Sequence, residues 1–184
     1  MNFMKHSNLV GKHALLGAST YHWINYSDDK VADYFLKMQA KSRGTELHEF
    51  AAQCIKLRQK LPRTNLTLNM YVNDAIGYRM TPEQVLYYSD NCFGTADSIS
   101  FKDGLLRIHD LKTGTTIAHM EQLLIYDALF CLEYKIDPSK IQIENRIYQN
   151  DEKIIATPDD EDIRPIMERI ISADKIINNV KNDI

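Results

Sequence analysis

The sequence has few of the features that identify a function directly. Its three cysteines, Cys54, Cys92 and Cys131, form no C-x-x-C pair, which argues against a disulfide framework, a zinc knuckle or an iron–sulfur cluster. No apolar run approaches the roughly 20 residues of a membrane helix, and no apolar stretch follows the first six residues. We therefore expect a cytoplasmic protein without a signal peptide or a membrane partner.

Two further absences restrict the function. The net charge of −3 excludes a protein that coats nucleic acid by bulk charge, although metal-binding carboxylates also count as negative until the ion binds. No G-x-x-x-x-G-K-[ST] motif occurs, so we expect no P-loop and no nucleotide cofactor. Positive charge is concentrated in one early segment, which is typical of a solvated helix face or of a surface that follows phosphates. Its members are Lys37, Lys41, Arg43, Lys56, Arg58, Lys60 and Arg63.

The 184 residues have the composition of one globular α/β domain, with 44% hydrophobic and 26% charged residues. Apolar periodicity predicts a helical region over about residues 1–80, in which the last helix covers residues 66–79. Gly44 and Thr45 predict a break between two of its helices, with Thr45 as the N-cap of the second. His48 would then lie in a first turn, where the helix dipole favours the neutral imidazole that can bind a metal ion.

The period changes to that of strands at residue 84, where a core over about 84–184 is predicted to begin. Lys102-Asp103-Gly104 predicts a hairpin turn between its second and third strands. The strands are expected at 84–89, 94–101, 105–112, 140–148 and 154–156, and the helices at 117–133 and from Thr157 onward. The last helix is expected to bury a stripe of four isoleucines: Ile163, Ile166, Ile170 and Ile171. This order predicts an α/β fold with a central mixed sheet flanked by helices, and not a Rossmann alternation.

The predicted hairpin carries the residues with the clearest chemistry. Asp110 and Lys112 are two positions apart on one strand, so their side chains share a face. Asp97 lies on the partner strand, and two converging carboxylates repel unless a cation lies between them. Aspartate oxygens favour a hard cation such as Mg²⁺ or Mn²⁺. A solvent-facing Asp–Lys pair is the alternative, because similar acidic-x-Lys triplets occur at 28–30, 133–135 and 151–153.

Four segments of this chain, in this order, resemble the PD-(D/E)xK nuclease superfamily, and within it the RecB-like branch that includes phage exonucleases. They are Gly44-Thr45-Glu46-Leu47-His48, Gly94-Thr95-Ala96-Asp97, Asp110-Leu111-Lys112-Thr113-Gly114 and Gln122-Leu123-Leu124-Ile125-Tyr126. The resemblance implies a restriction-endonuclease-like core and a metal-dependent hydrolysis of DNA phosphodiester bonds. Ala96 stands where the superfamily's name has proline, a departure that removes no ligand.

The resemblance also implies the ligands of a Mg²⁺ or Mn²⁺ ion. These would be His48, Asp97, Asp110 and the backbone carbonyl of Leu111. Glu46 and Glu49 flank His48 and would be substitute ligands, or would simply face water.

The remaining matched residues would act on the water and the substrate. Lys112 would position and help to deprotonate the attacking water. Gln122 and Tyr126, four positions apart on one helix face, would steady the lysine or hold the scissile phosphate. Arg43 and Thr113 would help to bind the substrate.

The function implied by the resemblance is an exonuclease or end-processing enzyme of phage or bacterial DNA recombination and repair. Its partners would be single- or double-stranded DNA ends and a recombination or single-strand-binding protein, and homo-oligomers are compatible with it. Two alternatives stay open at this point. One is a restriction-like or junction-resolving endonuclease, and the other is a catalytically silent module of the same fold that binds nucleic acid or protein.

Overall fold

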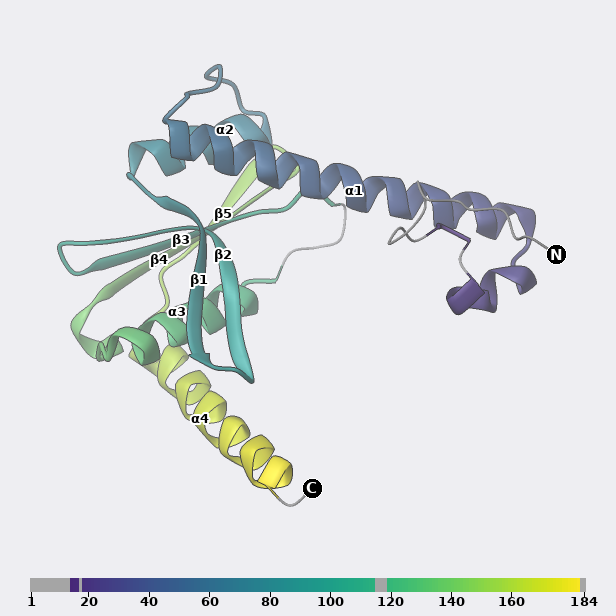
Figure 1. Cartoon of the computed structure of the whole chain (residues 1–184). Coiled ribbons are helices and arrows are strands. Elements are labelled where there is room, and N and C mark those ends of the chain that lie inside the picture. Colours follow the sequence, from purple (N-terminus) through teal and green to yellow (C-terminus); the bar gives the residue numbers. More distant parts are fainter. Residues whose placement is uncertain (1–13, 17, 115–118, 183–184) are drawn as a thin grey trace, which may run out of the picture. The chain divides into compact units, whose positions relative to one another are not determined.

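Figure 1 shows the computed structural model of the chain, which describes residues 14–16, 18–114 and 119–182. The chain divides into two compact units, Met1–Thr45 and Glu46–Ile184. A short 3-10 helix, η2 (Ala18–Asn25), belongs to the first unit. Among the described residues, no helix combines the length and the apolar character needed to cross a membrane. The predicted organisation as a single domain stays a prediction.

One long helix, α1 (Asp28–Leu57), takes the place of the two helices expected around Gly44 and Thr45. The predicted break is wrong. The Thr45 hydroxyl donates a hydrogen bond of 3.2 Å to the carbonyl of Lys41, four residues back, so it does not cap a new helix. The helix ends where Arg58 takes a positive φ of 55° and its amide and that of Gln59 bond back to carbonyls of the last turn.

The second helix of the larger unit, α2 (Thr67–Gly77), packs against the sheet together with the end of α1. Tyr71, Val72 and Ala75 of α2 form a buried core with residues of α1 and with Leu111 and Tyr148 of the sheet. Expected over 66–79, this helix is confirmed.

The sheet has five strands in the order β1-β2-β3-β4-β5. Its strands are β1 (Thr81–Ser89), β2 (Cys92–Lys102), β3 (Leu105–Leu111), β4 (Gln142–Gln149) and β5 (Glu152–Ala156). All neighbouring pairs are antiparallel except β3 and β4, which are parallel, so the expected mixed sheet is confirmed. Asp103 and Gly104 both have positive φ, of 52° and 77°, as a two-residue hairpin turn requires.

The opposite face of the sheet is covered by α3 (Glu121–Tyr134), against which α4 (Asp160–Asn182) packs. The helix expected over 117–133 is α3, although residues 117 and 118 lie outside the described part. A 3-10 turn, η3 (Pro138–Lys140), leads from α3 into β4. Asp159 caps α4 by accepting the amides of Glu161 and Asp162, so α4 begins three residues later than Thr157.

Candidate functional site

The site is built where β1 and β2 are distorted opposite each other. Pro82 pairs with Ser98 and Gln84 with Ala96, so Glu83 lies across from Asp97. Ala96 packs into the core on the α3 side, whereas the Ser98 hydroxyl lies 3.8 Å from the Met80 sulfur in the core on the α2 side. Residues two apart on a regular strand share a face, so β2 twists at Asp97. Glu83 has a positive φ of 51°, which marks the matching irregularity in β1.

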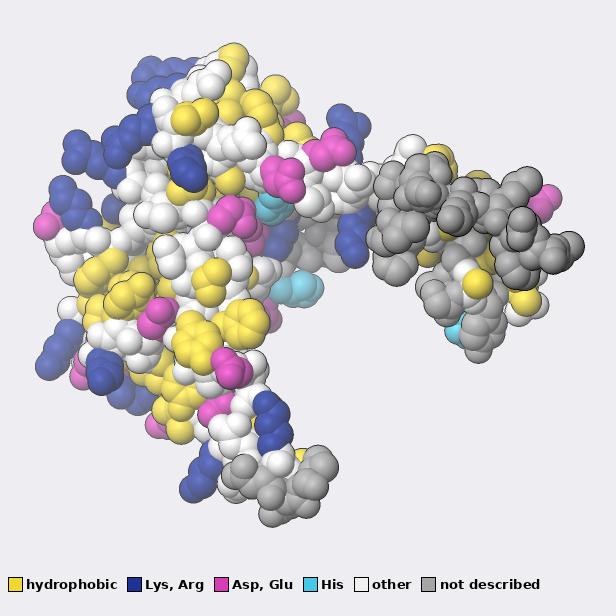
Figure 2. All heavy atoms as spheres, viewed as in Figure 1, with side chains coloured by type: hydrophobic (Ala, Val, Ile, Leu, Met, Phe, Trp, Pro, Cys, Tyr) yellow, Lys and Arg dark blue, Asp and Glu magenta, His cyan; other side chains and the backbone are white. Residues whose placement is uncertain are grey.

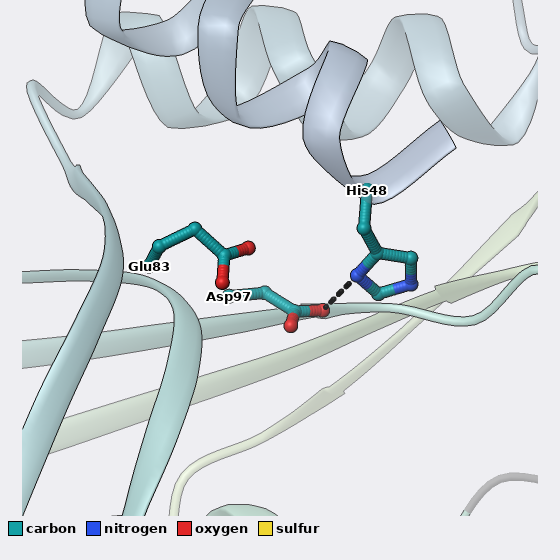
Figure 3. A group of neighbouring side chains, drawn as sticks. All are labelled: His48, Glu83 and Asp97. Carbon is teal, nitrogen blue, oxygen red and sulfur yellow. Dashed lines mark ion pairs between the residues drawn. The ribbon is translucent and has the colours of Figure 1, made fainter. Parts of the chain in front are cut away.

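Three potential metal ligands meet at this distortion (Figure 3). His48 of α1, Glu83 of β1 and Asp97 of β2 each offer one ligand atom, and these atoms lie within 4.8 Å of one another. His48 Nδ1 is 3.4 Å from Asp97 Oδ2. The same oxygen accepts a 2.8 Å hydrogen bond from the amide of Leu111, which fixes the Asp97 carboxylate against the end of β3.

Lys112 follows β3 and is held by two polar partners. Its Nζ donates to Asp110 Oδ1 at 3.1 Å and lies 2.9 Å from Oδ2 of the same carboxylate. It also donates to Gln122 Oε1 at 2.7 Å. Asp110 and Lys112 therefore share a face, as the spacing predicts, and Lys112 joins the strand to α3.

The contacts continue from Gln122 to β2. Gln122 Nε2 donates to the Tyr126 hydroxyl at 3.1 Å, and this hydroxyl donates to the carbonyl of Thr95 at 2.8 Å. The predicted i, i+4 contact of Gln122 with Tyr126 is thus present, and Gln122 steadies the lysine. The result is one connected set of hydrogen bonds that runs from Asp110 through Lys112, Gln122 and Tyr126 to the Thr95 carbonyl of β2.

Gly94 has a steric reason to be glycine. A Cβ atom placed on Gly94 would lie 2.8 Å from Cε1 of Tyr126, closer than carbon atoms can approach without movement of the ring. The missing side chain therefore lets the Tyr126 ring lie against β2 and reach the Thr95 carbonyl.

The charges at the site influence one another. The hydrogen bond to Asp97 raises the pKa of His48 above its ordinary value, against an opposing effect of burial. Burial raises the pKa of Asp110, the negative charge of Asp97 raises it further, and Lys112 lowers it. The pKa of Glu83 is also raised by burial and by Asp97. Without a cation, the carboxylates thus resist being charged together.

These residues fit a hard divalent cation. Asp110 is 2% exposed, and its Oδ2 lies 2.9 Å from Lys112 Nζ. This ion pair compensates part of the cost of burying the carboxylate, and a bound cation would add to that compensation. Two or three carboxylates with one imidazole form a ligand set suited to Mn²⁺ and, with fewer nitrogen contacts, to Mg²⁺.

His48 does not occupy the position that the sequence predicts for it. Because α1 continues through Gly44 and Thr45, His48 lies in the interior of the helix. It is therefore far from the first turn, where the helix dipole would favour the neutral imidazole. Its pKa is raised, which is opposite in direction to the expected preference for the neutral ring. It nevertheless reaches Asp97. Glu46 and Glu49 on either side are exposed to solvent.

Glu83 is the residue that the sequence interpretation missed. The predicted strand begins at residue 84, one position too late to include it, and the preceding Pro82 suggests a strand end. Its position in the sequence could have identified it. Glu83 is an acidic residue directly after a proline, at the start of an edge strand that pairs with Gly94-Thr95-Ala96-Asp97.

The predicted substrate-binding residues Thr113 and Arg43 lie outside the cluster of potential metal ligands. Thr113 follows Lys112 and lines, with Leu47, Leu68 and Asn150, a pocket of about 260 Å³ beside the site. Arg43 is exposed and belongs to the first unit. The ligand role of the Leu111 carbonyl and the substrate roles of Arg43 and Thr113 stay predictions. No protein-family model matches the chain, and no curated protein is significantly similar to it in sequence.

Proposed function

We propose that this protein is a metal-dependent deoxyribonuclease of the PD-(D/E)xK superfamily, of the RecB-like kind, built on a restriction-endonuclease-like core. The observation that supports it most is the occurrence of a buried Asp110–Lys112 ion pair next to a group of three potential metal ligands. Lys112 Nζ lies 2.9 Å from Asp110 Oδ2, and the ligand atoms of Asp97, His48 and Glu83 lie within 4.8 Å of one another. The two sets are linked because Asp97 accepts the amide of Leu111, the residue between Asp110 and Lys112. Isolated acidic clusters are common, but a buried aspartate paired with a lysine beside such a cluster is not required by the fold.

The residues of the chain have complementary roles in this proposal. A Mg²⁺ or Mn²⁺ ion held by His48, Glu83, Asp97 and Asp110 would neutralise phosphoryl charge and lower the pKa of a bound water. Lys112, fixed by Asp110 and Gln122, supplies a positive charge and orients the attacking water. Tyr126 and Gln122 keep this lysine from turning away, which limits the entropy lost on reaching the transition state.

Among nucleases we favour an exonuclease or end-processing enzyme over a restriction-like or junction-resolving endonuclease. Among the described residues, the larger unit consists of the sheet, the helices that cover it and the site, with no added element suited to reading a base sequence. We place its activity in the cytoplasm, in DNA recombination or repair. The silent-module alternative is disfavoured because Asp110 is buried beside Lys112, an arrangement that contributes little to stability and that binding alone does not require.

The proposal is tested with end-labelled linear DNA and closed circular DNA, each incubated with Mg²⁺, Mn²⁺ or EDTA. We expect the linear DNA to be degraded with either metal and the circle to stay intact. Asp110→Asn and Lys112→Ala should each lower the rate by at least about a thousand-fold, whereas Lys102→Ala, at an exposed lysine of the hairpin, should leave it unchanged. Cutting of circles would favour the endonuclease, and a wild-type rate in either site variant would refute the assignment.

A further inference from the structure

The β1–β2 ribbon has an open face on which two cross-strand pairs and the Glu83–Asp97 position lie in a row. Alternate residues are exposed on this face, while Leu86 and Ala96 on the other face are buried against α3. Tyr87 pairs with Phe93 and Val85 with Thr95, and Glu83 lies across from Asp97. The row therefore leads from the aromatic pair, past the smaller Val85–Thr95 pair, to the carboxylate cluster.

The aromatic pair is arranged like a platform. Phe93 is 62% exposed and Tyr87 is 44% exposed. Their ring centroids are 6.4 Å apart at an interplanar angle of 28°, and the Tyr87 hydroxyl is tied to Asp90 at 2.8 Å. Figure 2 shows hydrophobic side chains gathered over the β1–β2 ribbon, next to the acidic and histidine side chains beneath α1. Large rings exposed in this way and held in place are available for stacking by a ligand.

The edge of β1 is unsuited to a protein strand. Pro82 has no amide proton, Glu83 has a positive φ, and the Tyr87 amide already donates to the Glu133 carboxylate at 2.9 Å. A partner that adds a strand needs these backbone groups free. The ligand of this region should therefore approach the face of the ribbon and not its edge.

We infer that Tyr87 and Phe93 stack with the unpaired bases of a single-stranded nucleic acid whose backbone continues to the Glu83–Asp97 cluster. Phe93 and Asp97 are four residues apart, or about 13 Å along the strand, so a few nucleotides would span them. Every base offers a flat face to an aromatic ring, whereas the bases of a duplex are stacked on one another. Asp90 and Glu133 beside the rings repel phosphates, which favours contact through bases.

The inference deepens the proposed function, because it makes single strands or frayed ends the preferred substrate. It is tested by binding, so that its failure is separate from a failure of the nuclease. The protein carries Asp110→Asn to prevent digestion, and anisotropy is measured without divalent metal. The probes are a labelled oligothymidylate, a duplex of the same length and an abasic strand of the same length.

Phe93→Ala should weaken binding of the oligothymidylate about ten-fold and change binding of the duplex and the abasic strand by less than about two-fold. Phe93→Trp should restore the affinity. Phe101→Ala is the matched control, because Phe101 lies on the same strand and is 43% exposed but packs against Phe130. It should leave all three affinities unchanged.

A second readout is fluorescence. The chain has one tryptophan, Trp23, so Phe93→Trp combined with Trp23→Phe places the only indole on the platform. Oligothymidylate should quench this indole and the abasic strand should not. An unchanged affinity in Phe93→Ala, an equal loss for all three probes, or an unquenched indole would each overturn the inference. If binding follows the expectation but the wild-type protein does not cleave DNA, the proposed nuclease function is refuted. The stacking of single-stranded bases on Tyr87 and Phe93 would then still hold.

Discussion

At the scale of the residue, Gly94 is where the smallest change should have a large effect. Gly94→Ala places a methyl group 2.8 Å from Tyr126 Cε1, so the ring must move and its bonds to Thr95 and Gln122 weaken. Because Gln122 steadies Lys112, we expect the cleavage rate to fall about ten- to a hundred-fold. The melting temperature should change little, since Tyr126 can shift toward solvent.

The control for this prediction is Gly77→Ala, where an added Cβ meets no atom within 4 Å. If the effect runs through the ring, Gly94→Ala should have no further effect in a Tyr126→Ala background. An equal loss with and without the ring would show that Gly94 acts in another way.

His48 and Glu83 allow a second prediction at this scale, on metal affinity. His48→Ala removes a nitrogen ligand and Glu83→Gln removes a carboxylate, so each should raise the metal concentration at half-maximal cleavage about ten-fold. The shift for His48→Ala should be larger with Mn²⁺ than with Mg²⁺, because imidazole suits transition metals better. High metal should restore part of the rate, since the two aspartates remain.

Glu49→Ala is the matched control for His48, as its exposed side chain is the next one on α1. It should leave the metal titration unchanged. A His48→Ala protein that loses stability but keeps the wild-type titration midpoint would mean that His48 is structural.

At the scale of the element, α3 is joined to β4 by a buried polar pair. Asn145 Nδ2 donates to Asp127 Oδ2 at 2.6 Å, and both residues are fully buried. The other oxygen of each side chain receives no hydrogen bond from the described residues. Burial raises the pKa of Asp127 to about 7, so below that pH the carboxyl is mostly protonated and no negative charge is buried there.

A dependence of stability on pH follows from this pair. Because the folded state binds the proton more tightly than the unfolded chain, the stabilisation is complete at low pH and is lost as pH rises from about 4 to about 7. The loss should amount to a few kcal/mol. Urea unfolding at about pH 5 and pH 8 measures it. Asp127→Asn, which keeps the shape but cannot ionise, should be less sensitive to this change, and an identical pH dependence would contradict the prediction.

At the scale of the whole molecule, positive charge is concentrated away from the carboxylates. Residues 50–73 contain no aspartate or glutamate, and Figure 2 shows basic side chains gathered over the end of α1 and the segment before α2. Four of its residues are both basic and exposed: Lys56, Arg58, Lys60 and Arg63. A surface of this kind suits a nucleic-acid backbone.

Neutralising these four charges should weaken DNA binding and reduce the slope of log affinity against log salt by about three. Alanine serves at three positions, and Arg58→Asn is used because Asn tolerates the positive φ there. The control replaces four exposed lysines elsewhere: Lys102, Lys140 and Lys175 become alanine, and Lys135→Asn is used because Lys135 also has a positive φ. Equal slopes for the two variants would show that the basic segment does not follow the phosphates.

Much of the fold could be predicted from the sequence because it depends on short-range patterns. The order of elements follows from apolar periodicity, and the hairpin turn follows from Asp103 and Gly104. The shared face of Asp110 and Lys112 and the contact of Gln122 with Tyr126 follow from the repeats of a strand and a helix. Besides the predicted break at Gly44 and Thr45, a second local pattern failed. Ile171, expected in the buried stripe of α4, is 45% exposed, because α3 covers only part of that helix.

Only the tertiary structure decided which residues complete the site. Glu83 joins it through the register of β1 against β2, which pairs residues 14 positions apart and cannot be read from either strand alone. A glycine in a helix costs only about 1 kcal/mol, so α1 can continue through Gly44. The end of α1 packs on the core through Ala51, Cys54 and Ile55, and His48 reaches Asp97 from the interior of this helix. Gly94 acquires its role only when Tyr126 is packed on it. Local periodicity thus determined the elements and the facing of nearby side chains, whereas long-range register and packing decided which groups meet.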